Sequence, residues 1–135
     1  MSSAIVVRDL EKSYDGLEAL RGVTFEIETG EVFGLLGPNG AGKTTTVEIL
    51  EGYRRRDGGT ASVLGHDPGN APRELRERIG VVLQHSELHP LLTVREVHLL
   101  FAGYFERSRD VDEVIALVGL EEKRDAQVKT LSGGQ

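Results

Sequence analysis

The sequence contains no cysteine and no tryptophan, and aromatic residues make up only 5% of it. The lack of cysteine excludes disulfide bonds and zinc or iron–sulfur sites with cysteine ligands. Because aromatics are scarce, a core has to be built mainly from valine, leucine, isoleucine and alanine. No apolar run approaches the ~18 residues that a membrane-spanning helix needs, and the richest stretch, Val32 to Leu36, already contains Gly34. If the protein works at a membrane, another chain or a further segment provides the span.

An excess of positive charge is missing too. The 135 residues include 22 acidic and 16 basic side chains, which gives a formal net charge of −6. A dedicated nucleic-acid-binding protein is expected to have a basic face, so this balance argues against that class, although a polyanion can still bind at one focused site. The run Arg54-Arg55-Arg56 is interpreted as a solvated surface segment. With 39% hydrophobic residues, a chain of this length can bury a sizeable core and form one domain or a large part of one.

Hydrophobic patterning predicts a strand-rich first half followed by helices. Residues 23–28 alternate apolar and polar side chains, which is typical of a half-buried strand. The mostly apolar runs 31–36 and 79–83 predict strands buried on both faces. Thr93 and Glu96 form a capping-box pattern at the start of a helix, and a second helix is predicted from Asp110 to Gly119. The remaining predicted elements are strands at 4–10 and 60–64 and helices at 43–51 and 71–78.

A glycine-rich loop, Gly37-Pro38-Asn39-Gly40-Ala41-Gly42-Lys43-Thr44, lies between a predicted strand and a predicted helix. It matches the phosphate-binding pattern G-x-x-x-x-G-K-[ST] and is called the P-loop below. Triphosphate oxygens must approach several backbone N–H groups closely, and a Cβ at any of its three glycines would obstruct that approach or the backbone angles it needs. The following helix directs its free N–H groups at the phosphates. Lys43 is placed to reach the β- and γ-phosphates, and the Thr44 hydroxyl to ligate Mg²⁺.

The last five residues are Leu131-Ser132-Gly133-Gly134-Gln135. A P-loop followed by this pentapeptide resembles the nucleotide-binding domain of ABC ATPases, whose signature motif it matches letter for letter. The resemblance implies an α/β P-loop NTPase fold, with a RecA-like core, an antiparallel β subdomain and an α-helical subdomain. It covers essentially the whole chain as a partial domain: residues 1–84 as the β-rich P-loop core, 85–130 as the helical subdomain and 131–135 as the signature.

The resemblance also implies a set of site residues. Tyr14 lies where the family has an aromatic residue that stacks on adenine, and the alternative is a half-buried packing residue. Gln84 lies where the family has a glutamine that senses Mg²⁺ and the γ-phosphate. Lys43 and Gln84 are therefore the expected catalytic residues, and Thr44 and Gln84 the expected Mg²⁺ ligands. The expected ATP-binding residues are Tyr14, Gly37, Pro38, Asn39, Gly40, Ala41, Gly42, Lys43, Thr44, Thr45, Ser132, Gly133, Gly134 and Gln135.

In the family, two nucleotide-binding domains sandwich each ATP between the P-loop of one and the signature of the other. The implied function is ATP binding and hydrolysis coupled to transport, on the cytoplasmic face of the membrane. The implied partners are a second such domain and transmembrane permease chains, without nucleic acid. The sequence from Leu36 to Thr46, with Glu51-Gly52 after it, resembles exporters of the drug-resistance type. The substrate and the direction of transport are not readable from these residues.

Two family elements have no counterpart here, namely the apolar strand ending in Asp-Glu and the switch histidine. The four histidines, His66, His85, His89 and His98, all precede the signature. The sequence is therefore interpreted as a fragment ending at the signature, and by itself it is expected to bind nucleotide weakly and to hydrolyse none.

Two alternatives remain. One is a soluble ABC-type ATPase acting on nucleic acid or ribosomes. Members of the DNA-repair type insert coiled coils or zinc modules between P-loop and signature, whereas here Gln84 and Leu131 are only 47 positions apart, without cysteine or heptads. The other alternative is a non-catalytic ATP-binding module.

Overall fold

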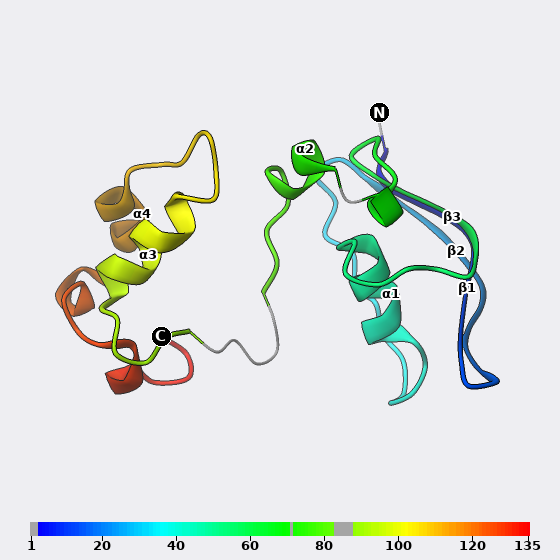
Figure 1. Ribbon diagram of the computed structural model, residues 1–135, viewed down its shortest axis with the longest axis horizontal. Helices are drawn as coiled ribbons and strands as arrows, with labels where there is room; N and C mark the ends of the chain where they lie inside the picture. Colours follow the sequence, from blue (N-terminus) through cyan, green and yellow to red (C-terminus); the bar gives the residue numbers. More distant parts are fainter. Residues whose placement is uncertain (1–2, 71, 83–87) are drawn as a thin grey trace. The chain divides into compact units, whose positions relative to one another are not determined.

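The structure, a computed structural model, describes residues 3–70, 72–82 and 88–135. The chain divides into two compact units, one ending at Val81 and the other beginning at Val82, and each is described by itself (Figure 1). The boundary at residue 84, expected from the family, falls outside the described residues and stays a prediction. Among the described residues, no helix is both long and apolar enough to cross a bilayer.

The first unit contains one antiparallel sheet of three strands in the order β2-β1-β3. Strand β1 spans Ser3–Tyr14, β2 spans Leu17–Glu28 and β3 spans Gly58–Val63. The strands predicted at 4–10, 23–28 and 60–64 are confirmed, although β1 and β2 are each 12 residues long. Asp15 and Gly16 join them with φ angles of 47° and 84°, the positive φ pair of a tight hairpin turn. The sheet forms the antiparallel part of the mixed α/β fold.

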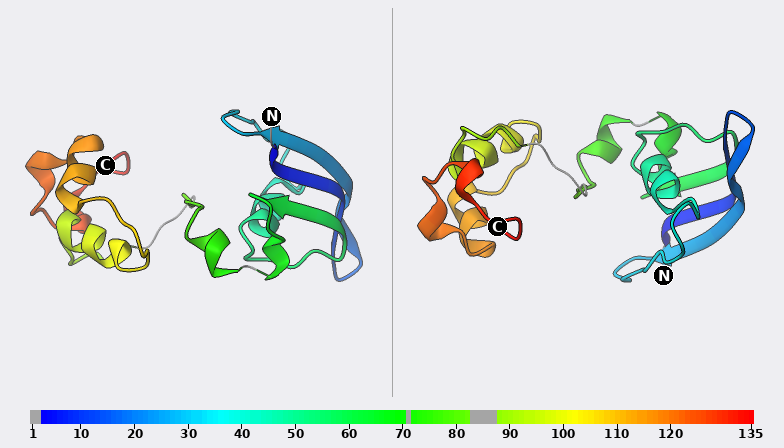
Figure 2. Two further views of the ribbon diagram at one scale, coloured as in Figure 1. Left: turned by 90° about the horizontal axis from the view of Figure 1, so that it is seen from above. Right: turned by 90° about the horizontal axis from the view of Figure 1, so that it is seen from below.

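Helix α1, Lys43–Leu50, packs on one face of this sheet (Figure 2). Its Ile49 is 1% exposed and joins Val7, Leu10 and Leu20 in the core of the unit. The helix ends as predicted: Glu51 is the C-cap, and Gly52 adopts a φ of 78° that a side chain would disfavour. The helix that follows the P-loop is thus fixed to the sheet by buried aliphatic side chains.

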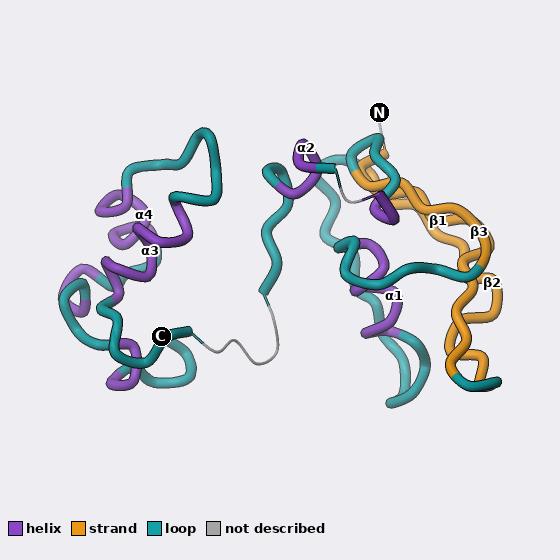
Figure 3. The backbone as a smooth tube through the Cα atoms, viewed as in Figure 1, coloured by secondary structure: helices purple, strands orange, loops and turns teal. Residues whose placement is uncertain are grey.

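The prediction of two strands buried on both faces, at 31–36 and 79–83, is wrong for the residues that the structure describes. Residues 31–36 and 79–82 have no regular secondary structure, and they are drawn as loop in Figure 3. Val32 is 98% exposed and Val82 fully exposed. A strand needs a neighbour to satisfy its N–H and C=O groups, and β2-β1-β3 is the only sheet in the described part of the chain. Phe33 instead stacks on Phe25 of β2, with ring centroids 5.2 Å apart.

The helix predicted at 71–78 is shorter in the structure. Helix α2 spans Arg73–Arg76, after the short 3₁₀ helix η1 at Pro68–Asn70. Pro72 has extended backbone angles and occupies the N-cap position, where the missing N–H of proline is not needed. Leu75 is the buried residue of α2. Position 71 lies outside the described residues.

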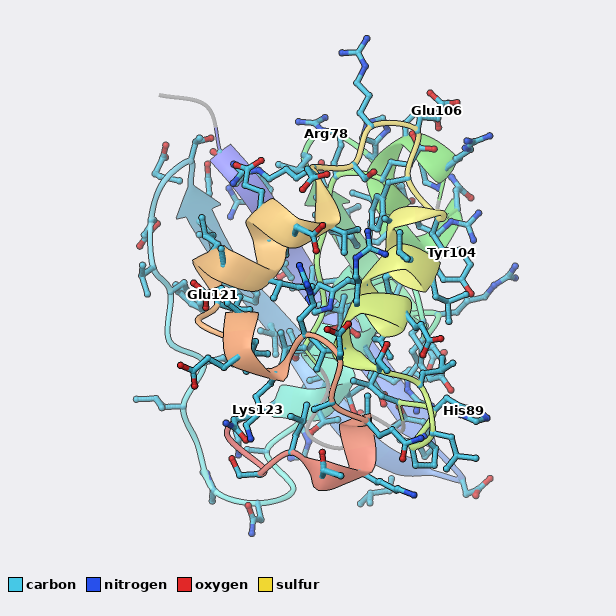
Figure 4. All side chains as sticks on the ribbon, turned by 90° about the vertical axis from the view of Figure 1, so that its left-hand side faces the viewer. Arg78, His89, Tyr104, Glu106, Glu121 and Lys123 are labelled. Carbon is cyan, nitrogen blue, oxygen red and sulfur yellow. The ribbon has the colours of Figure 1, made fainter. Side chains whose placement is uncertain are left out.

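The second unit consists of helices packed on a small aliphatic core. Helix α3 spans Val94–Ala102 and α4 spans Val111–Leu117, and the 3₁₀ helices η2 and η3 span Glu121–Lys123 and Val128–Thr130. Its core consists of Val94, Val111 and Ile115, with Leu120 and Leu131 packed against them. Tyr104 and Glu106 lie at the surface of this unit, on the connection between α3 and α4 (Figure 4).

Both predicted helix starts in this unit are confirmed. The Thr93 hydroxyl accepts the N–H of Glu96, and the Glu96 carboxylate accepts the N–H of Thr93, which completes the capping box. Because these hydrogen bonds favour the charged carboxylate, they hold the pKa of Glu96 below its ordinary value. Asp110 caps α4 by accepting N–H groups from Asp112 and Glu113. Gly119, with a φ of 70°, follows the end of α4.

Candidate functional site

The P-loop lies in the first unit, between the irregular segment 31–36 and α1. Its turn is closed by the N–H of Ala41, which donates to the carbonyl of Pro38 at 3.2 Å. Gly42 is the N-cap of α1, and no side chain caps the helix there. The first turn of α1 contains no acidic residue either. No side chain of the loop therefore compensates the partial positive charge at the N-terminus of α1, and the binding of an anion there stays a prediction.

Lys43 folds back over this loop. Its ammonium group donates to the carbonyl of Gly37 at 2.5 Å and to that of Pro38 at 2.6 Å, and both hydrogen bonds are solvent-exposed. Thr44 is exposed and Thr45 half-buried, whereas Thr46 is buried and its hydroxyl donates to the Gly42 carbonyl at 2.9 Å. Thr46 was not among the predicted site residues, and its contact makes it an anchor for the first turn of α1.

The three glycines of the P-loop are needed for different reasons. A Cβ on Gly42 would lie 2.4 Å from Leu20 Cδ2 and 2.6 Å from the carbonyl oxygen of Ala19, so the loop packs directly against β2. Gly42 and Gly40 also have φ angles of 81° and 82°, which side chains disfavour. Around Gly40 there is open space, and a Cβ on Gly37 would lie 3.3 Å from the Ala41 side chain. Only Gly42 is thus required by contact with the sheet.

Tyr14 is half-buried at the end of β1 and has two cations beside its ring. The Arg54 guanidinium carbon lies 5.2 Å from the ring centroid and the Lys12 ammonium nitrogen 5.4 Å from it. Each cation is held by a carboxylate: Arg54 Nε donates to Glu48 of α1 at 2.5 Å, and Lys12 donates to Asp57 at 2.7 Å. Sequence reasoning missed both cations, because no local pattern links positions 12, 14 and 54.

These ion pairs shift the pKa values of the groups involved. The hydrogen bond to Glu48 raises the pKa of Arg54. The hydrogen bond from Lys12, together with the backbone N–H of Ser13, lowers the pKa of Asp57. The interpretation of Arg54-Arg55-Arg56 as a solvated run is correct for Arg55, which is exposed. It is wrong for Arg54, which pairs with Glu48, and for Arg56, which pairs with Asp67.

Arg56 forms the third ion pair of this region. Its two terminal nitrogens donate to the two carboxylate oxygens of Asp67, both at 2.7 Å, and its Nε donates to the Gly59 carbonyl at 3.1 Å. Asp67 also accepts the N–H of Gly69 at 2.7 Å. The paired guanidinium lowers the pKa of Asp67 to about 2. These hydrogen bonds join the segment after α1 to the turn after β3.

The signature residues lie in the second unit, on a stretch that is hydrogen-bonded to the start of α3. The N–H groups of Val94 and Arg95 donate to the carbonyls of Ala126 and Arg124, both at 3.0 Å. Leu131 packs on the core, and Ser132 to Gln135 form an exposed turn closed by the Gln135 N–H to the Ser132 carbonyl at 3.0 Å. A Cβ on Gly133 or Gly134 would meet open space. Among the described residues of this unit, no contact requires glycine at either position.

The P-loop fits a metal-bound triphosphate by the chemistry of its groups. An exposed threonine hydroxyl and a lysine at a helix N-terminus suit Mg²⁺ that is ligated mostly by phosphate oxygens and water. The described residues contain no cluster of three histidine, aspartate or glutamate side chains that could hold a metal by themselves. Gln84, the second predicted Mg²⁺ ligand, lies outside the described residues and stays a prediction.

A profile of the family described as "ABC transporter" matches residues 20–135, from β2 through the P-loop to the signature. This chain belongs to the ABC transporter family. It is similar to the Nod factor export ATP-binding protein I of Burkholderia orbicola, with 43% identity over 94% of this chain and 43% of that protein. It is also similar to the linearmycin resistance ATP-binding protein LnrL of Bacillus subtilis, with 36% identity over 93% of this chain and 42% of that protein. The chain thus spans less than half the length of these ABC relatives.

Solved structures agree with this membership. The structure titled as an ATP-binding subunit of an ABC transporter matches 96% of this chain and 56% of its own, with a TM-score of 0.83 and 27% identity. An ATP-binding cassette of an ABC transporter in its ADP conformation matches 98% of this chain and 60% of its own, with a TM-score of 0.75 and 23% identity, which bears on the fold alone. The fold is that of the P-loop NTPases, as predicted.

Proposed function

We propose that this chain is the ATP-binding part of an ABC exporter, which couples ATP binding and hydrolysis to transport. The observation that carries the proposal is the P-loop, whose lysine lies over an uncapped helix N-terminus packed on the sheet through Gly42. Both curated relatives described above are named as ATP-binding proteins, one of an export system and one of a resistance system. These names support the exporter assignment for this chain.

The role of each P-loop residue follows from its present contacts. The Lys43 ammonium exchanges its two carbonyl acceptors, Gly37 and Pro38, for phosphate oxygens. The exchange replaces neutral carbonyl oxygens with negatively charged phosphate oxygens, and the attraction between opposite charges favours binding. Thr44 is exposed on the first turn of α1, and its hydroxyl is the proposed side-chain ligand for Mg²⁺ there. Mg²⁺ neutralises negative charge on the phosphates when it is bound. The Tyr14 ring is the proposed platform for adenine.

Ser132, Gly133 and Gly134 are proposed to contact the nucleotide of a second ABC nucleotide-binding domain. Support comes from the position of these residues on an exposed turn, which a second domain can reach. Gln84 is proposed to couple the nucleotide state to transmembrane permease chains. Such a subunit works at the cytoplasmic face of the membrane as a peripheral protein, without nucleic acid.

The two-subunit part of this proposal is tested with Gly134→Asp, which places bulk and negative charge on the exposed signature turn. We expect loss of ATP-dependent association in sedimentation, because the carboxylate repels the γ-phosphate of the partner's nucleotide. ATP affinity of the single subunit should change by less than about twofold. Ala116→Asp, which adds the same charge on the exposed side of α4, is the matched control. If Gly134→Asp weakened ATP binding to the single subunit as strongly as it weakened association, the signature would serve the nucleotide of its own subunit.

The transport assignment is tested by recovering the tagged protein from its own cells. We expect it in the membrane fraction, cross-linked to an integral membrane chain. Recovery with ribosomes or DNA instead would favour a soluble ABC-type ATPase and contradict the exporter assignment.

A further inference from the structure

Two cations lie beside the ring of Tyr14, one from the segment after α1 and one from β1 itself. Arg54 follows α1, and its guanidinium carbon lies 5.2 Å from the ring centroid. Lys12, on the same strand as the ring, lies 5.4 Å from the centroid. Cations at these distances are attracted by the negative π-face of an aromatic ring. The orientation of the ring therefore depends on where these two cations are held.

Arg54 is the cation that connects the ring to the helix of the P-loop. Its Nε donates to Glu48 Oε2 at 2.5 Å, and its backbone N–H donates to the Glu48 carbonyl at 3.0 Å. Glu48 lies on α1, one turn beyond the P-loop residues Lys43 and Thr44. The side chain of Arg54 is 35% exposed and that of Glu48 25% exposed, so the pair is partly shielded from water. The hydrogen bonds to Glu48 thus fix the guanidinium of Arg54 relative to α1, independently of its contact with the ring.

Lys12 provides a second support that does not involve α1. Its ammonium donates to Asp57, and Asp57 also accepts the N–H of Ser13 at 2.8 Å. This pair holds the end of β1 to the segment before β3. Removing Arg54 therefore leaves the strand in place and frees the ring only on the side of α1.

We propose that Arg54 is a positioning residue, which fixes the Tyr14 ring relative to α1 so that a nucleotide held by the P-loop meets the ring with its base. The inference rests on the proposed function, in which ATP binds at the P-loop and Tyr14 stacks on the base. Arg54 acts through Tyr14 and not on the phosphates. Its contribution is therefore expected only for ligands that carry a base, and only while the aromatic ring is present.

The test compares Mg-ATP with Mg-tripolyphosphate, which has the phosphates and no base, by isothermal titration calorimetry. Arg54→Met keeps the length of the side chain and removes its charge. We expect it to weaken ATP binding about two- to fivefold, the size of a cation–π contact near a surface, and to leave tripolyphosphate binding unchanged. Arg54→Lys should restore most of the ATP affinity. Arg55→Met removes the same charge from the exposed neighbouring position and should affect neither ligand.

A double-mutant cycle with Tyr14→Leu isolates the coupling between the two side chains. In that background we expect Arg54→Met to have no further effect on ATP binding. Glu48→Gln, which retains a hydrogen-bonding side chain, provides a second and milder variant with the same expected selectivity for ATP if Arg54→Met does not fold. Equal weakening of ATP and tripolyphosphate, or tighter ATP binding without the guanidinium, would overturn the positioning role. Binding of neither ligand by the unaltered protein, at ligand concentrations high enough to fill a weak site, would overturn the proposed function itself, and this inference with it.

Discussion

Replacing Gly42 by alanine should destabilise the first unit more than any other single methyl group added to the P-loop. The new Cβ would lie 2.4 Å from Leu20 Cδ2 and 2.6 Å from the carbonyl oxygen of Ala19. The leucine can move, but the backbone carbonyl in β2 cannot move without disturbing the sheet. A φ of 81° adds about 1–2 kcal/mol of backbone strain, and overpacking typically adds about 1–3 kcal/mol. Together these costs lower the free energy of unfolding by about 3 kcal/mol.

Gly40→Ala is the matched control, because its φ of 82° is nearly identical while the space around its Cβ is open. Only the strain then applies, so we expect a loss of about 1 kcal/mol. Urea denaturation followed by circular dichroism measures both values. Equal destabilisation of the two variants would show that strain alone acts, and that the contact between the P-loop and β2 contributes nothing.

Three further predictions concern stability. Asp67→Asn removes the bidentate pair with Arg56 and should cost about 1 kcal/mol at neutral pH, a value reduced for the 40% exposure of Asp67. Arg56 lowers the folded-state pKa of Asp67 from 3.8 to about 2, so the unaltered protein should lose this stability as the pH falls from 3.8 to about 2. Urea denaturation over this pH range should show a much smaller loss in the variant. Asp110→Ala removes the cap of α4 and should cost about 1 kcal/mol in thermal unfolding, whereas Glu122→Ala, at an exposed position of η2, should cost much less. Ile49→Ala opens a cavity beside Leu10 and Leu20 and should cost about 2–4 kcal/mol in urea denaturation, whereas Val47→Ala, at a 43% exposed position, should cost less than 1 kcal/mol.

Features that depend on nearby residues were predictable from the sequence. The capping box of Thr93, the Asp110 cap and the end of α1 before Gly52 are each set within a few positions of chain. The P-loop turn also follows local rules, since Gly40 and Gly42 have positive φ angles, which glycine adopts readily. These elements form where the sequence places them because their hydrogen bonds close locally.

Features that depend on distant partners were not predictable. The run 31–36 has the composition of a buried strand, but a strand forms only where another pairs with it, and no such partner lies in the described part of the chain. The extent of β1 was underestimated, because Asp9 has a φ of 48° and the β1–β2 register shifts between Val7 and Leu10. Such a bulge interrupts the alternation of side chains on which strand prediction relies.

The candidate site shows the same division. The residues of the P-loop were named from the sequence, whereas Arg54, Lys12 and Thr46 were not, since their roles arise from contacts formed in the folded unit. Arg54 in particular was assigned to a solvated run because its partner Glu48 is six positions away, across the end of α1. Ion pairs that cross the end of a helix follow from tertiary structure and not from helical spacing.

The binding of Mg-ATP to the unaltered protein and to Lys43→Ala, measured by calorimetry, tests the central claim most directly. Lys43 is held over the P-loop by the carbonyls of Gly37 and Pro38, and its charge should pass to the phosphates. Hydrogen bonds to charged groups contribute about 1.5–3 kcal/mol, so Lys43→Ala should bind Mg-ATP about 10- to 150-fold more weakly. Lys129→Ala, which removes the same charge from an exposed position of the second unit, should bind as the unaltered protein does. Equal affinities for Lys43→Ala and Lys129→Ala would contradict the assignment of the P-loop as the ATP site.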